Sequence, residues 1–180
     1  MNKLNRERTE LAASHLKDFY ENLNPEDIER FKEYYRLDAT FRDPFNNVKG
    51  IDGIQRIFKH MFTQVHQPRF KITRSITDEG EVILFWDFEF NLKILWWKRH
   101  QCIQGVSYLT FDQNGLIEMH RDYWDAAEEL YEKLPKDRKK YLAQVFGMVA
   151  VEFGCGSFRT PRWNVGFGAY LIQGAPHPRG

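Results

Sequence analysis

Cysteine is nearly absent from this chain of 180 residues, which holds only Cys102 and Cys155. These two match neither the spacing of a zinc site nor the bridge framework of a small secreted scaffold. The sequence also lacks an apolar run near the ~20 residues that a membrane-spanning helix needs, and its first residues lack the apolar stretch of a signal peptide. We therefore expect a cytoplasmic protein with no membrane span.

Motifs of several common enzyme classes are missing as well. The sequence has no phosphate-binding loop, nucleophile elbow or dinucleotide fingerprint, and its histidines fit no metal-ligand spacing. Net charge is +1, but residues 136–180 hold seven basic and two acidic residues, a net +5, so residues 1–135 carry −4. Because nucleic acid requires a basic surface, the acidic main body argues against that partner. We expect no metal and no organic cofactor.

Apolar periodicity divides the chain into a folded part and a tail. Three segments show helical spacing of apolar residues, at 4–23, from 24 to about 38, and 54–65. From residue 70 the period changes to two, which predicts strands at 70–77, 81–94, 102–111 and 115–125. Helices followed by strands predict an α+β domain over residues 1–135, with the helices packed on one face of a curved antiparallel sheet. Residues 136–180 form a basic, Gly-rich tail, in which 136–146 are compatible with a short basic helix and no element is recognisable beyond Gly147.

The last predicted strand carries the most reactive residue types. Alternation places on one face Leu116, Glu118, His120, Asp122 and Trp124. The strand at 81–94 presents Trp86 and Phe88 on one face, so an ionisable pair is expected beside aromatic rings. Burial there would raise the pKa of the carboxyl group and lower that of the imidazole, which suits acid–base chemistry. The alternative is a satisfied ion pair or hydrogen bond in a pocket wall.

Asp43 is the second candidate carboxylate. It precedes Pro44, a position where an aspartate commonly bonds nearby backbone amides in a turn. A chemical role and a turn role both remain open for this residue.

Two motifs carry a family resemblance, Phe41-Arg42-Asp43-Pro44 after the second helix and His120-Arg121-Asp122-Tyr123-Trp124-Asp125 on the last strand. In this order, over residues ~8–134, the chain resembles the SnoaL-like, nuclear transport factor two-like superfamily. The resemblance implies a cone-shaped fold in which a bent sheet wraps round three helices, with an apolar pocket at one end. It also implies a homodimer formed through the outer face of the sheet.

Within that superfamily the chain is similar to ketosteroid isomerases at Asp43, which matches their proton-shuttling aspartate. Those enzymes also hold an oxyanion with a tyrosine of the first helix and a protonated aspartate of the third strand. Phe19 and Ser107 occupy these positions here, and Tyr20 is expected to point elsewhere. The oxyanion site of that branch is therefore missing or rebuilt.

Limonene-epoxide hydrolases are similar in the last strand, where Asp122 matches a catalytic aspartate. Their long strand also supplies an arginine and an aspartate two residues apart. Here the same face presents Trp86 and Phe88, and the other face presents Asp87 and Glu89, with no arginine. The resemblance thus implies one of three parts of that catalytic set.

Two functions follow from these observations. The first is an acid–base enzyme of the isomerase, cyclase or epoxide-hydrolase kind, acting on a small apolar molecule with Asp122, His120 and Asp43 as catalytic residues. The second is a non-catalytic ligand-binding or dimeric interaction module of the same fold. In either case we expect a pocket lined by Trp86, Phe88, Ser107, Trp124, Phe19, Tyr34, Phe58 and Phe62.

Overall fold

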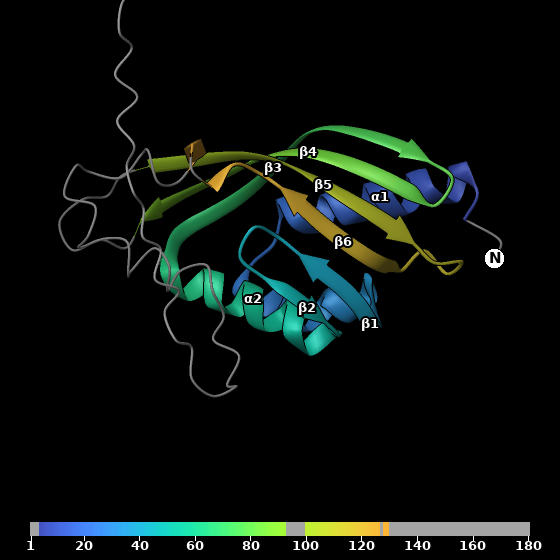
Figure 1. The fold of residues 1–180 in the computed structure, drawn as a ribbon, viewed down its shortest axis with the longest axis horizontal. Coiled ribbons are helices and arrows are strands. Elements are labelled where there is room, and N and C mark those ends of the chain that lie inside the picture. Colours follow the sequence, from blue (N-terminus) through green and yellow to red (C-terminus); the bar gives the residue numbers. More distant parts are fainter. Residues whose placement is uncertain (1–3, 93–99, 127, 130–180) are drawn as a thin grey trace, which may run out of the picture.

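A computed structural model describes residues 4–92, 100–126 and 128–129, so the predicted tail at 136–180 lies outside the described residues. These described residues contain three helices: α1 (Arg6–Glu21), the 3-10 helix η1 (Pro25–Glu33) and α2 (Ile51–Gln64). The strands are β1 (Tyr35–Arg42), β2 (Asn47–Lys49), β3 (Val65–Asp78), β4 (Glu81–Leu92), β5 (His100–Phe111) and β6 (Ile117–Tyr123). They form one sheet in the order β2-β1-β6-β5-β4-β3, which arches over the helices (Figure 1). The α+β architecture with helices on a curved sheet is thus confirmed.

The second helix is shorter and tighter than the sequence predicts. It is a 3-10 helix that ends at Glu33, and strand β1 begins at Tyr35, so the prediction of a helix to about residue 38 is wrong. The apolar residues Ile28, Phe31 and Tyr34 are three apart, which is the period of a 3-10 helix rather than an α-helix. Beyond Tyr34 the backbone pairs with a distant strand, and that partner was not visible in the local pattern.

The sheet is mixed, although the sequence predicts antiparallel pairing throughout. Strand β1 runs parallel to β6, with Phe41 opposite His120 and Arg42 opposite Arg121. All other pairs are antiparallel. The parallel pair brings the end of β1 and the following Asp43 next to the end of β6, which carries Asp122. The two sequence motifs therefore meet where β1 and β6 end, side by side.

A β-bulge changes the predicted faces of β6. Ile117 pairs with Phe111 and Met119 pairs with Thr110, so Glu118 is an additional residue on β6. As a result Ile117 and His120 both face the core, while Glu118 forms an ion pair with Arg36. The prediction that Glu118 shares a face with His120 is wrong, because strict alternation does not survive a bulge.

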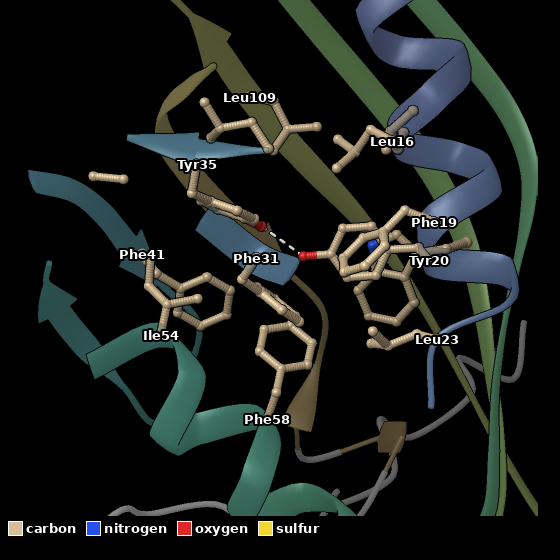
Figure 2. Close-up of a cluster of buried hydrophobic side chains, with 14 of the residues drawn as sticks. Leu16, Phe19, Tyr20, Leu23, Phe31, Tyr35, Phe41, Ile54, Phe58 and Leu109 are labelled. Carbon is tan, nitrogen blue, oxygen red and sulfur yellow. Dashed lines mark hydrogen bonds between the residues drawn. The ribbon is translucent and has the colours of Figure 1, made fainter. Parts of the chain in front are cut away.

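The core lies between the helices and the inner face of the sheet and is rich in aromatic rings (Figure 2). Phe31 is fully buried, and its ring centroid lies 5.2 Å from Phe19, 5.7 Å from Tyr35 and 4.6 Å from Phe58. This packing fixes α1, η1, α2 and β1 against one another. Among the described residues, no helix is long and apolar enough to cross a membrane. The homodimer and the cytoplasmic location stay predictions.

Candidate functional site

His120 and Asp122 lie side by side on the inner face of β6. Nε2 of His120 is 2.8 Å from Oδ1 of Asp122, and the Ser107 hydroxyl on β5 donates to the same oxygen at 2.5 Å. The Trp86 indole N–H on β4 donates to the Ser107 oxygen at 2.9 Å. Three neighbouring strands therefore fix one oxygen of the Asp122 carboxylate.

The network continues inward through two tyrosines. Nδ1 of His120 is 2.6 Å from the Tyr35 hydroxyl, which is 2.5 Å from the Tyr20 hydroxyl on α1 (Figure 2). One assignment of hydrogens gives every donor an acceptor: Tyr20 donates to Tyr35, Tyr35 donates to Nδ1, and Nε2–H donates to Asp122. The reverse order would leave the Tyr20 hydroxyl without an acceptor among the described residues. We therefore assign Nδ1 of His120 as the acceptor from Tyr35 and Nε2–H as the donor to Asp122.

Burial keeps both tyrosines protonated. It raises the pKa of the Tyr20 hydroxyl and of the Tyr35 hydroxyl well above the ordinary value of a phenol, because a phenolate would lose its hydration in the core. Each hydroxyl can therefore serve as a donor at any moderate pH, as the assignment requires.

With this order of donors, removing the two tyrosine hydroxyls should lower the stability of the protein by unequal amounts. Tyr35→Phe leaves Nδ1 of His120 without a donor and Tyr20 without an acceptor, so we expect a loss of about 1–3 kcal/mol in the free energy of unfolding. Tyr20→Phe removes only the bond that Tyr35 accepts, and we expect about 0.5–1.5 kcal/mol. Urea unfolding measures both, with the half-exposed Tyr123→Phe as a control near zero. If the donors ran the opposite way, Tyr20→Phe would leave the Tyr35 hydroxyl without an acceptor, so a loss of stability as large as that of Tyr35→Phe would contradict the assignment.

The second oxygen of Asp122 faces open space. Neither Ser107 nor His120 contacts it, and it has no hydrogen-bond partner within the described part of the chain. Over the same residues no side-chain nitrogen or oxygen is buried without a partner, so this oxygen is reachable from a hollow. The Asp122 side chain is 16% exposed. One oxygen is therefore held and the other is free to meet a ligand.

Asp122 lines a mostly apolar cavity of about 140 Å³ between α2 and the inner face of the sheet. Together with Asp43, Arg42 and Arg121 it also lines a wider, more open hollow. The polar lining of the apolar cavity includes both Asp43 and Asp122. Its aromatic lining consists of Phe41, Phe58, Phe70, Trp86, Phe88, Phe90 and Trp124. A smaller space of about 30 Å³ lies beneath it, lined in part by Tyr20, Ser107 and His120. A cavity of roughly 150 Å³ accommodates benzene, so the main cavity has room for a compact ligand.

Gly105 on β5 makes the position of Trp86 possible. A Cβ atom at residue 105 would lie 2.3 Å from Cη2 and from Cζ2 of the Trp86 indole. The indole therefore occupies the space above Gly105, and from there its N–H reaches Ser107. No sequence pattern marks this glycine, because the close approach comes from a residue on the neighbouring strand.

We expect Gly105→Ala to push Trp86 out of place and to lower the free energy of unfolding by about 1–3 kcal/mol. Trp86→Leu removes the ring, so adding Gly105→Ala to that background should cost much less than it does alone. Chemical denaturation of the two single variants and the double variant measures the coupling. If the losses of unfolding free energy in the two single variants simply add in the double variant, the close contact between Gly105 and Trp86 would be contradicted.

Asp43 takes the turn role that its position before Pro44 allows. Its Oδ1 accepts hydrogen bonds from the backbone amides of Phe45 at 2.7 Å and Asn46 at 2.5 Å, and the Asn46 amide group donates to Oδ2 at 2.9 Å. Burial raises the pKa of Asp43 despite these bonds, and the charge of Asp122 adds to the rise. No ion pair joins Asp43 or Asp122 to the neighbouring Arg42 or Arg121 in the described ranges.

Some of the residues predicted to line a pocket do so in the structure, and others lie in the core. Trp86, Phe88, Trp124 and Phe58 line the main cavity, and Ser107 lines the smaller space. Phe19, Tyr34 and Phe62 line neither space and pack against the core instead, where Phe19 and Tyr34 stack with ring centroids 4.2 Å apart.

Tyr20 was expected to point away from the site. In the structure it points inward and contacts Tyr35, so Tyr20 rather than Phe19 carries the hydroxyl of α1 into the site. Among the described residues, no group of three or more His, Cys, Asp or Glu is placed to hold a metal ion.

Several solved structures share the fold of this chain. A protein from Catenulispora acidiphila with a ketosteroid isomerase-like fold, in complex with trimethylamine, has a TM-score of 0.58 and 15% identity over 70% of this chain and 95% of its own. A nuclear transport factor two-like protein of unknown function from Burkholderia pseudomallei has a TM-score of 0.59 and 14% identity, and the match covers 69% of this chain and 95% of that protein. An LEH-like epoxide hydrolase from M. tuberculosis has a TM-score of 0.57 and 17% identity, and the match covers 77% of this chain and 96% of that enzyme. At such identities the likeness shows the fold alone.

In sequence, none of the curated proteins compared with the chain matches it significantly. The family model of the SnoaL-like domain, in contrast, matches residues 16–120, which is more than half of the chain and runs from α1 into β6. The match includes the segments that carry Asp43, Ser107 and His120. This chain therefore belongs to the SnoaL-like domain family.

Proposed function

We propose that the chain binds a small, largely apolar molecule in the cavity and that Asp122 transfers a proton to or from it. The observation that carries the proposal is the asymmetry of the Asp122 carboxylate. Ser107 and His120 fix Oδ1, while Oδ2 has no hydrogen-bond partner among the described residues, and the Asp122 side chain lines a cavity whose walls are mainly aromatic. A general base needs such a fixed orientation and one accessible oxygen.

His120 and Asp43 have supporting roles in this proposal. His120 contacts Asp122 but does not line the main cavity, so it positions the carboxylate, and Tyr35 in turn fixes the tautomer of His120. Asp43 lines the same cavity as Asp122. Its raised pKa suits a group that returns a proton. The epoxide hydrolase among the proteins of this fold makes water addition one candidate reaction, and proton transfer at carbon is another.

A non-catalytic binding module is the second candidate, and one observation favours it. The hydroxyls of Ser107 and Tyr20, which would be the nearest donors for a developing oxyanion, are both used inside the network. A reaction through an oxyanion would lack these donors, whereas simple binding does not require them.

A thermal-shift screen of small terpenoid, polyketide-like and aromatic compounds tests the binding proposal, because a ligand that binds only the native state raises the melting temperature with concentration. Ile57 lines the cavity from α2, so Ile57→Phe should fill it and abolish the shift. Leu11→Phe adds a ring at an exposed position of α1 and should leave the shift unchanged. Shifts that survive Ile57→Phe, or no shift with any compound, would reject the cavity as the binding site.

A further inference from the structure

Among the described residues, neither acid of the cavity forms an ion pair with a lysine or an arginine. Asp43 and Asp122 line the cavity, and no lysine or arginine of the described ranges does so. The polar side chains that remain in the lining belong to Asn46, His60 and Gln64. Arg42 and Arg121 line a neighbouring open hollow together with Asp43 and Asp122, but among the described residues neither forms an ion pair with the two acids.

The hydrogen bonds of Asp122 do not supply a positive charge either. Ser107 carries no charge, and in the assigned order of donors His120 reaches Asp122 through Nε2–H and accepts from Tyr35 at Nδ1. Both donors meet Oδ1, so Oδ2 has full capacity to accept another hydrogen bond. A carboxylate in apolar surroundings without a counter-charge is unfavourable, and a ligand that brings a positive charge would offset that cost.

The rest of the cavity suits a cation that is surrounded by alkyl groups. Its lining is dominated by phenylalanine and tryptophan rings, including Phe70 and Phe88, which stack at 4.4 Å, and Trp86 and Trp124. Aromatic rings attract ammonium groups through their quadrupole, and they also contact the methyl groups of substituted amines. The volume of about 140 Å³ limits the ligand to a compact one.

We propose that the ligand of this cavity is a small protonated amine with apolar substituents, whose N–H donates to Oδ2 of Asp122 while its alkyl groups contact the aromatic rings. The inference rests on the proposed function only in taking this cavity as the ligand site. It does not require that Asp122 be catalytic.

Pairs of isosteric ligands test the charge directly. Dimethylaminoethanol and isoamyl alcohol differ only in a protonated nitrogen against a carbon, and both can be titrated by calorimetry at neutral pH with the full-length chain. We expect the amine to bind about tenfold more tightly. Choline, which has the charge but no N–H, should bind less tightly than dimethylaminoethanol. Asp122→Asn should abolish the preference for the amine, while Asp87→Asn on the outer face of β4, where Asp87 bonds Gln104, should retain it.

The outcomes separate this inference from the proposed function. Equal affinity for the two isosteres in the wild-type chain would overturn the amine inference and leave the apolar site intact. A preference that survives Asp122→Asn would overturn the assignment to Asp122. If neither isostere binds while neutral compounds from the thermal-shift screen do, the amine inference fails alone. If no compound of any kind binds, both proposals fail. The comparison of the two isosteres in the wild-type chain tests the amine inference even if Asp122→Asn does not fold. Binding of isoamyl alcohol by Asp122→Asn would show that this variant is folded.

Discussion

Asparagine in place of Asp122 is expected to lower the turnover of a substrate that binds in the cavity by about 10²–10⁴-fold, the usual contribution of a general acid or base. The amide oxygen can still accept the bonds from Ser107 and His120, so the local structure should survive. The amide cannot take up a proton, and that is the only property the mechanism requires of Oδ2. The binding of a neutral ligand should change little, which would place the loss in kcat rather than KM.

The matched control for that experiment is Asp87→Asn. Asp87 lies on β4 next to Trp86, but it faces away from the cavity and bonds Gln104 at 2.9 Å. It undergoes the same change of charge and shape, and turnover should be unaffected. Turnover of Asp122→Asn at the wild-type rate would remove Asp122 from the mechanism and favour the binding module.

The largest loss of stability is expected from Phe31→Ala, at about 3–5 kcal/mol in the free energy of unfolding. Phe31 has 0% exposure, and its ring lies between α1, α2 and β1 (Figure 2). It stacks on Tyr35 at 5.7 Å and meets Tyr20 edge-on at 6.3 Å. Its removal should leave a cavity that the surrounding rings cannot fill, because the sheet and both α-helices hold them in place.

Phe31→Ala should also disturb the site at a distance, since the Tyr20–Tyr35–His120 bonds depend on this packing. Chemical denaturation gives the stability, and the nitrogen chemical shifts of the His120 ring report its tautomer. Leu37→Ala is the control, because Leu37 is 74% exposed on β1 and its truncation should change stability by less than about 0.5 kcal/mol. A cost for Phe31→Ala as small as that of Leu37→Ala would contradict the packing described above.

Much of the site was accessible to sequence reasoning because it depends on local alternation. In a stretch of strand without a bulge, residues two apart, such as His120 and Asp122, face the same side whichever strand lies beside them. The same rule places Trp86 and Phe88 together on β4. Both expectations hold in the structure, and both pairs face the interior. The motif before Pro44 likewise indicated a turn, and Asp43 bonds the backbone amides of that turn.

The partners of these residues could not be obtained in the same way. Tyr35 was assigned to a helix, because its neighbours Phe31 and Tyr34 continue an apolar pattern. In the structure it starts a strand, and it bonds His120 across 85 positions of sequence. The bulge at Glu118 and the close approach of Trp86 to Gly105 also arise between strands. A register shift or a shared space has no counterpart in the pattern of one segment.

The sequence by itself determined the composition of the site: which acids, rings and imidazole stand on which strand face, and that helices precede a sheet. Only the tertiary structure decided that β1 lies parallel to β6 and that Tyr20 points inward. It also decided that one oxygen of Asp122 is held while the other stays open. The physical reason is that side-chain direction follows from backbone geometry within a segment, whereas hydrogen-bond partners follow from which segments pack together.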